Sequence, residues 1–180
     1  MPRCFVGYLL PKGLKNNIET IQKEIATWPL KCKFVERDNL HLNFSFLGEI
    51  SENEINNIKL KLDTIAVESK KFKVLIGELR AIPDKNYIRV LVLDVTCYDE
   101  NMKNLFAKIL ERVGGDSKPV HLTLCRVKSI SDKFLVRKKI ETLEKKQQGE
   151  FVINSIQLIK SELGPSGPVY SVIHESNLID

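Results

Sequence analysis

The sequence has few of the residues that build metal centres or disulfide frameworks. It contains four cysteines among 180 residues, and Cys4, Cys32, Cys97 and Cys125 include no Cys-x-x-Cys pair. This spacing argues against a zinc knuckle or a disulfide scaffold, so the cysteines are expected to be reduced and mostly buried. No apolar run approaches the roughly 18 residues of a membrane span, and the first residues lack the layout of a signal peptide. We therefore expect a cytoplasmic protein that does not contact a membrane.

Two motifs of nucleotide-dependent enzymes are also missing. The chain has neither the phosphate loop Gly-x-x-x-x-Gly-Lys nor a Lys-x-Asp-Gly motif, so ATP-driven ligation gains no support. What the chain does have is an ordinary globular composition, 43% hydrophobic and 28% charged, which excludes disorder. Its 28 lysines and arginines exceed its 23 acidic residues by five. This modest excess is compatible with a phosphate-bearing ligand, although many basic proteins bind no nucleic acid.

Hydrophobic periodicity predicts a mixture of strands and helices along the whole chain. Ser51 and Glu54 have the spacing of a capping box, which marks a helix start. Residues 90–93 are apolar enough to be covered on both faces, which favours a central position in the sheet. No linker divides the chain, so we expect one α+β domain over residues 1–180. Helices are predicted over residues 14–28, from Ser51, over 99–113 and from Ser131 or Asp132; strands are predicted over 3–10, 40–46, 72–82, 87–95, 120–126, 150–163 and 169–173.

The two halves of the sequence resemble each other when it is shifted by 80 positions. His41 then aligns with His121, and the helix-capping Ser51 aligns with Ser131. This internal repeat predicts two similar lobes.

Both aligned histidines begin a segment with an alternating apolar and polar pattern. In a strand such residues project from opposite faces, so each histidine should share a polar face with the side chain two residues later. The expected polar faces are His41, Asn43 and Ser45 on one strand, and His121, Thr123 and Cys125 on the other.

Two imidazoles across a cleft can divide acid–base work at a phosphodiester. With reference pKa values near 6.5, one can act as a neutral base while the other acts as a protonated acid. Asn43 and Thr123 can donate hydrogen bonds to the non-bridging oxygens, without a metal. The alternatives are a structural role for each histidine in the core, or zinc binding, for which no third or fourth ligand is suitably spaced.

These residues resemble the two-histidine phosphoesterases, and specifically their RNA 2',3'-cyclic phosphodiesterase branch, also called 2'-5' RNA ligases. The hallmark is a His-x-Thr-x motif present twice, which residues 121–124 match fully, with Arg126 where an arginine often follows. Residues 39–49 are similar to the first copy, except that Asn43 replaces threonine. The segment 167–170 is similar to one in archaeal-type members, whereas Val120 separates Pro119 from the histidine where proline is commonly adjacent.

The resemblance implies a bilobal α+β fold, with two pseudo-symmetric lobes of antiparallel sheet, helices packed outside and a central cleft. It also implies a monomer that hydrolyses RNA 2',3'-cyclic phosphate ends to 2'-phosphates without a metal or cofactor. It implies that His121 is the general base and His41 the general acid. Asn43, Thr123 and Arg126 would bind the phosphate, with Ser45 as a further candidate. The substrate would be an RNA end or a small cyclic-phosphate nucleotide, and a 5'-hydroxyl in place of water would give ATP-independent ligation.

Asn43 leaves a second reading open. Its amide donates hydrogen bonds as a hydroxyl does, with a reach about one bond longer, but a misplaced phosphate would lower the rate. The alternative function is a non-catalytic or weakly active protein that binds RNA ends. His174, near the end of the sequence, has no partner in the repeat and is expected to face solvent.

Overall fold

The computed structural model describes residues 1–116, 118–143, 148–165 and 167–180, which form an antiparallel sheet with four helices packed against it. In chain order the elements are β1 (Arg3–Leu9), α1 (Lys12–Ala26), β2 (Leu30–Phe34), the 3-10 helix η1 (Arg37–Asn39), β3 (His41–Glu49), α2 (Glu52–Val67), β4 (Phe72–Pro83), β5 (Ile88–Cys97), α3 (Asn101–Arg112), β6 (His121–Ile130), α4 (Lys133–Leu143), β7 (Gly149–Ile153), β8 (Ser155–Leu163) and β9 (Pro168–Asn177).

The sheet has two arms that meet at the two histidine strands. The strand order is β7-β4-β5-β6-β3-β1-β8-β9, and β2 pairs separately with β6. β3 and β6 pair at Leu42 and Leu122, both of which are buried. The apolar character of residues 90–93 predicts a position at the centre of the sheet. They lie instead in β5, one strand away from the two histidine strands. The expected burial on both faces is confirmed at Leu91, Val92 and Leu93.

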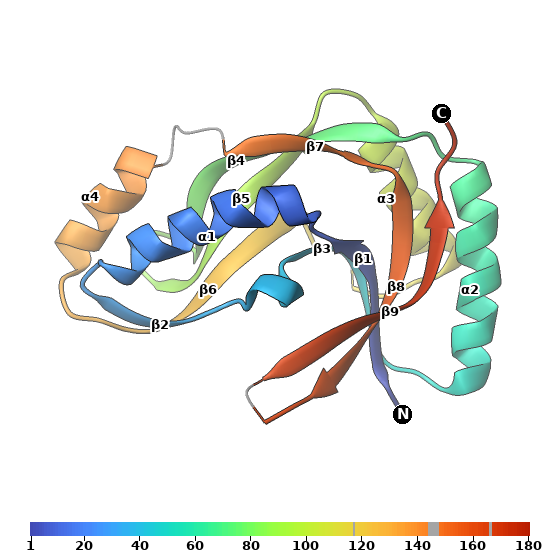
Figure 1. Ribbon diagram of the computed structural model, residues 1–180, viewed down its shortest axis with the longest axis horizontal. Helices are drawn as coiled ribbons and strands as arrows, with labels where there is room; N and C mark the ends of the chain where they lie inside the picture. Colours follow the sequence, from blue (N-terminus) through green and yellow to red (C-terminus); the bar gives the residue numbers. More distant parts are fainter. Residues whose placement is uncertain (117, 144–147, 166) are drawn as a thin grey trace.

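Each arm carries two of the helices on its outer side. α1 contacts β6 and β2, and α4 contacts β4, whereas α2 contacts β8 and β9, and α3 contacts β3 (Figure 1). The apolar stripe of α1 is buried as predicted, at Leu14, Ile18, Ile21 and Ile25. This arrangement confirms the expected α+β class with two sheet halves and helices outside. The correspondence of the two halves at an offset of 80 positions stays a prediction.

Helix starts follow the expected local chemistry. Ser51 and Glu54 form the complete capping box that their spacing predicts. For α4, the Asp132 carboxylate accepts the backbone N–H of Leu135 at 2.9 Å, so Asp132 caps the helix. Ser131 instead donates its hydroxyl to the Pro29 carbonyl at 3.0 Å. None of the helices in the part of the chain described here is long and apolar enough to span a membrane.

The sheet is curled, and the chain crosses between its arms over a very short distance. Residues 150–163 are predicted as one strand, but Asn154 divides them into β7, which pairs with β4, and β8, which pairs with β1. One residue can join strands of opposite arms only where the outer edge of one arm returns close to the other. Asn154 fixes this junction, since its Oδ1 accepts the Tyr8 hydroxyl at 3.0 Å.

The β8–β9 hairpin projects from the body of the molecule, with the start of β1 beside its base (Figure 1). Its predicted turn spans residues 164–168, of which Ser166 lies outside the described residues. Gly164 and Gly167 close the turn with backbone hydrogen bonds of 2.8 and 3.3 Å in opposite directions.

Candidate active site

His41 and His121 occupy matching positions, each at the first residue of a central strand. The Nδ1 atom of His41 lies 2.7 Å from the carbonyl oxygen of Asn39, and that of His121 lies 2.9 Å from the carbonyl oxygen of Pro119. A carbonyl oxygen only accepts, so Nδ1 carries the hydrogen in both rings. In the neutral form of each histidine, Nε2 is then the basic nitrogen.

The electrostatic environment of His41 favours its neutral form. Burial lowers the pKa of His41, the hydrogen bond to the Asn39 carbonyl partly offsets this, and the charge on His121 lowers it further. A proton on His121 thus disfavours a proton on His41.

Two aromatic rings hold the His41 imidazole in place. The ring centroid of His41 lies 5.0 Å from that of Phe5 and 5.0 Å from that of Tyr170, and the last two lie 5.1 Å apart. The Asn39 amide also donates to the Pro168 carbonyl at 2.5 Å, which fastens the chain before His41 to the hairpin. These contacts exclude water from one side of the imidazole, which is the desolvation that lowers its pKa.

A cavity of about 490 Å³ joins most of the predicted site residues. Its volume lies in the range typical of small-molecule sites. Its lining includes the predicted residues His41, Asn43, His121, Thr123 and Arg126, together with Phe5, Lys33, Phe34, Val35, Glu36, Asn39, Phe46, Lys118, Pro119, Ser161, Pro168 and Tyr170.

Ser45 does not belong to this cavity, which corrects its prediction as a phosphate ligand. Val6 pairs with Ser45 but the next residue of β1, Gly7, pairs with Asn43, so β3 has one extra residue at Phe44. This bulge ends the strict alternation. Ser45 is 1% exposed and donates its hydroxyl to the Gly114 carbonyl at 2.6 Å. Phe46, which alternation places in the core, is 37% exposed and lines the cavity instead.

The second histidine strand has the equivalent irregularity. Leu91 pairs with Cys125 and Val92 with Thr123, so Leu124 is the extra residue of β6. Leu124 and Cys125 are consequently both fully buried, although alternation predicts Cys125 beside His121. The bulge brings Arg126 to the cavity face, where the sequence resemblance places a phosphate ligand.

Asn43 lines the cavity with an amide that is not satisfied by the protein. Its Oδ1 atom is buried and has no hydrogen-bond partner within the described residues. Unpaired buried polar groups are uncommon in folded proteins, and an amide oxygen can pair only with a hydrogen-bond donor, not with a phosphate oxygen. The NH2 group of the same amide is a donor suited to a phosphate oxygen.

Gly7, opposite Asn43, allows the close approach of β1 to β3. A Cβ atom at Gly7 would lie 2.3 Å from the carbonyl oxygen of Leu42, next to His41. The sequence pattern indicates neither this glycine nor Phe5, because their roles depend on how neighbouring strands pair.

The remaining charged groups favour an anionic ligand. The cavity lining contains three cationic side chains, Lys33, Lys118 and Arg126, and one carboxylate, Glu36. Lys118 forms an ion pair with Asp116 at 2.7 Å, whereas Arg126 has no ion-pair partner among the described residues. Within the same residues no cluster of three His, Cys, Asp or Glu side chains could hold a metal.

His174 lies outside the cavity. Its Nε2 atom is 2.8 Å from the Asp63 carboxylate of α2, which also accepts the Ser176 hydroxyl at 2.7 Å. Ser176 therefore bonds to the carboxylate rather than to His174, and the three residues join α2 to β9 without the arrangement of a catalytic triad.

A curled antiparallel sheet whose two central strands bring a histidine each to one cavity defines the class of two-histidine phosphoesterases. The model of the family described as LigT like Phosphoesterase matches residues 9–92. An RNA 2',3'-cyclic phosphodiesterase of Methanocaldococcus jannaschii is 34% identical over 179 residues, which cover 96% of this chain and 99% of the relative. The enzyme of the same name from Aquifex aeolicus is 32% identical, with coverage of 96% and 95%.

Solved structures share the fold. A protein of Thermus thermophilus superimposes with a TM-score of 0.82 at 22% identity, covering 98% of this chain and 97% of its own. Escherichia coli LigT complexed with 3'-AMP gives 0.79 at 18% identity, with coverage of 99% and 98%. The chain belongs to the LigT-like phosphoesterase family and is a phosphoesterase, which confirms the family predicted from the two histidine motifs.

Proposed function

We propose that this protein hydrolyses the 2',3'-cyclic phosphate at an RNA end and leaves a 2'-phosphate. The observation that carries the proposal is the pair of histidines in one cavity, each with Nδ1 bound to a backbone carbonyl and with Nε2 left for proton transfer. Arg126, in the lining of the same cavity, supplies positive charge beside them. The activity named for the relatives from Methanocaldococcus jannaschii and Aquifex aeolicus supports the same reaction.

In the proposed mechanism each histidine moves one proton. His121 removes a proton from water, whose oxygen attacks phosphorus, and the bond between phosphorus and the 3' oxygen breaks. His41 gives its proton to that 3' oxygen, so a 3'-hydroxyl and a 2'-phosphate result. Asn43, Thr123 and Arg126 bind the non-bridging oxygens, where negative charge accumulates in the transition state.

The lowered pKa of His41 makes substrate binding part of this mechanism. An acid must be protonated, yet burial lowers the pKa of His41 and so favours its neutral form. A phosphate anion beside the imidazole favours the charged form. His41 would therefore take up its proton as the substrate binds, and it would be least protonated when no substrate is present.

The same side chains could also transfer the phosphate to a hydroxyl of another RNA strand instead of to water. If a 5'-hydroxyl replaces water, His121 removes its proton and the product is a 2'-5' phosphodiester. The bond between phosphorus and the 3' oxygen again breaks, and His41 protonates that oxygen. No ATP is needed because the strained cyclic phosphate is already activated. Hydrolysis is expected to dominate because water is abundant.

The direct test is to identify the product formed from an oligonucleotide that ends in a 2',3'-cyclic phosphate. In the presence of EDTA the wild type is expected to give a 2'-phosphate, because the proposed chemistry uses only protein side chains. The products are separated by chromatography against 2'- and 3'-phosphate standards. A 3'-phosphate product, or activity that disappears with EDTA, would contradict the mechanism. Saturable binding without turnover would favour the alternative function of an RNA-end-binding protein.

Asn43→Thr tests whether the departure from the family motif has damaged the site. The NH2 group of Asn43 reaches about one bond further than a threonine hydroxyl, so the shorter hydroxyl is expected to lower kcat by about tenfold through misplacement of the phosphate. The measurement is kcat on the same oligonucleotide, with Asn57→Thr on the exposed side of α2 as the control. A large gain in kcat would instead identify Asn43 as the cause of a weakened site.

A further inference from the structure

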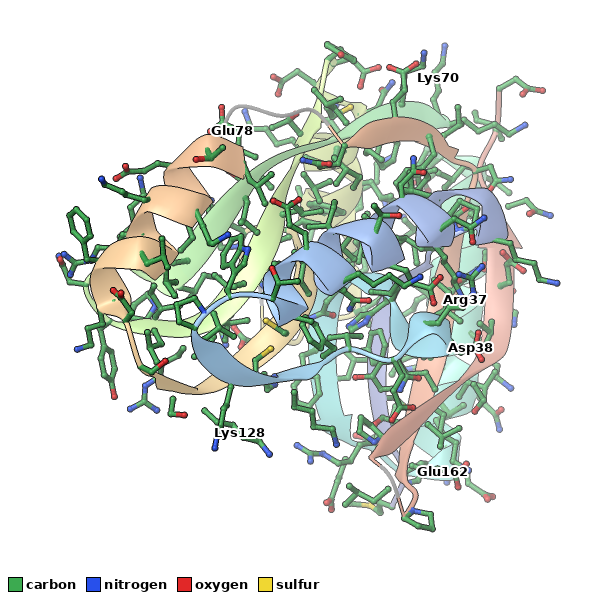
Figure 2. All side chains as sticks on the ribbon, turned by 60° about the vertical axis from the view of Figure 1, so that its left-hand side comes forward. Arg37, Asp38, Lys70, Glu78, Lys128 and Glu162 are labelled. Atoms are coloured by element: carbon green, nitrogen blue, oxygen red, sulfur yellow. The ribbon has the colours of Figure 1, made fainter. Side chains whose placement is uncertain are left out.

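The side chain of Tyr170 reaches the reaction cavity from the last strand of the sheet. Tyr170 lies in β9, which is separated from the histidine strand β3 by β1 and β8. It pairs with Ser161 of β8, on the projecting hairpin where Figure 2 labels the next residue, Glu162. The centroid of its ring nevertheless lies 5.1 Å from that of Phe5 and 5.0 Å from that of His41. The side chain therefore extends across β8 and β1 toward the histidines.

Small residues on the two intervening strands leave room for this reach. Ser161 has a short side chain, and it lines the same cavity as Tyr170. Gly7 has no side chain, and a Cβ atom there would lie 3.1 Å from the Phe5 ring, so this ring packs directly over β1. The rings of Phe5 and Tyr170 then meet edge to face, at an interplanar angle of 71°. Because the hydroxyl of tyrosine lies on the axis of its ring, contacts that hold the ring also fix the position of the hydroxyl.

The Tyr170 hydroxyl is left without a partner by the protein. The hydroxyl of Tyr8, by comparison, donates to Asn154 at 3.0 Å, but that of Tyr170 forms no hydrogen bond with any residue that the structure describes. It is also not sealed in the core, since the buried side-chain atoms without a partner in those residues belong to Trp28 and Asn43. A partly buried phenol usually has a hydrogen-bond partner. A ligand in the cavity can supply the one that is missing.

Arg126 makes an anionic oxygen the fitting partner. Both Arg126 and Tyr170 line the reaction cavity. Burial raises the pKa of Tyr170, and the nearby charge of Arg126 offsets part of this rise. The phenol therefore keeps its proton at neutral pH and can donate a hydrogen bond. A guanidinium only donates, so an atom shared by the two side chains must be an acceptor, and a negatively charged oxygen accepts from both.

We propose that Tyr170 is a further catalytic residue, whose hydroxyl donates a hydrogen bond to the same non-bridging phosphate oxygen that Arg126 binds. The hydroxyl keeps its proton throughout and stabilises the negative charge that accumulates on this oxygen in the transition state. Asn43 and Thr123, on the two histidine strands, bind the other non-bridging oxygen. This inference rests on the proposed function and adds to it a side chain that belongs to neither histidine motif.

Tyr170→Phe tests the hydroxyl alone, because it keeps the ring and its contacts. With the oligonucleotide substrate kcat is expected to fall by about 10- to 100-fold, the range that one hydrogen bond to a charged group represents. KM should change less, since the charge accumulates in the transition state. Tyr98→Phe is the matched control, because Tyr98 is 71% exposed and does not line the cavity. The unfolding temperature of Tyr170→Phe should equal that of the wild type, since the lost hydroxyl bonds to nothing in the described part of the protein.

Sulfur in place of a non-bridging oxygen identifies the atom that the hydroxyl contacts. The endo and exo isomers of uridine 2',3'-cyclic phosphorothioate each carry sulfur at one of the two positions. Sulfur is a weak acceptor, so the isomer with sulfur beside Tyr170 already lacks most of the hydrogen bond. Tyr170→Phe should lower kcat/KM for this isomer by less than about twofold, and for the other isomer and uridine 2',3'-cyclic phosphate by at least about tenfold.

A second variant separates the hydroxyl from the packing of the ring. Tyr170→Leu removes both and opens one side of His41 to water. Because burial is the main cause of the lowered pKa of His41, this pKa should rise, and the alkaline fall of kcat/KM should move to higher pH. In Tyr170→Phe the fall should stay where the wild type has it. A shift in Tyr170→Phe would assign the lost activity to His41 and would overturn a direct contact with the phosphate.

The outcomes separate this inference from the function on which it rests. An unchanged kcat of Tyr170→Phe, or an equal loss with both sulfur isomers and the oxygen substrate, would overturn the role of the hydroxyl. The proposed reaction would still stand if the wild type forms the 2'-phosphate. If the wild type cleaves none of these substrates, the proposed function itself fails, and the inference fails with it.

Discussion

Alanine in place of either His41 or His121 is expected to lower the turnover of an RNA 2',3'-cyclic phosphate by about 10³-fold. The expectation follows from the separate proton that each ring transfers, since a positioned acid or base typically contributes 10²- to 10⁴-fold. The variant that lacks both histidines should be little worse than either single variant, because the two transfers belong to one concerted displacement. Single-turnover rates with saturating enzyme measure this loss without interference from product release.

The third histidine provides the matched control. His174→Ala removes an imidazole that bonds to Asp63 outside the cavity, so its turnover should equal that of the wild type. Circular dichroism and thermal unfolding of the three single variants distinguish a loss of catalysis from a loss of folded protein. His41 and His121 both line a cavity and are partly exposed, so their removal should change stability little. Strong destabilisation with unchanged activity of the folded fraction would instead show that both histidines are structural.

The sequence predicts most elements of the fold because their signals are local. The capping box at Ser51, the apolar stripe of α1 and the alternation before each bulge depend on residues a few positions apart. β2 was missed although Leu30, Cys32 and Phe34 alternate with lysines. Five residues of alternation are within the length that indicates a strand, and the pairing of β2 with β6 confirms that the segment is one.

The residues of the site could be predicted from the sequence only as far as the apolar and polar alternation of β3 and β6 holds. His41, Asn43, His121 and Thr123 precede the bulges, so spacing alone places them correctly on the cavity face. Beyond the bulges alternation fails, and it assigns Ser45 and Cys125 to the site in place of Phe46 and Arg126. A bulge depends on the length of the partner strand, information that is absent from the strand's own sequence. The resemblance to a family identified Arg126, but it offered no such guide to Phe46.

A leaving group that needs no proton is expected to restore activity to His41→Ala but not to His121→Ala. Replacing the bridging 3' oxygen of the substrate with sulfur provides this leaving group. A thiol has a pKa near 8.5, against 15.7 for water, which an alcohol approximates, so the thiolate departs unprotonated. With this substrate His41→Ala should be within about tenfold of the wild type, whereas His121→Ala should keep a loss of about 10³-fold because the attacking water still needs a base.

The pH profile of the same sulfur substrate checks the assignment in the wild type. With the oxygen substrate His41 must be protonated, and burial lowers its pKa. The fall of kcat/KM on the alkaline side should therefore begin below the ordinary histidine value of about 6.5. With the sulfur substrate that proton is no longer needed, so the alkaline fall should disappear while the acidic one remains. If sulfur rescues His121→Ala instead, the roles are reversed: His41, kept neutral by the rings of Phe5 and Tyr170, is then the base, and its low pKa sets the acidic side of the profile.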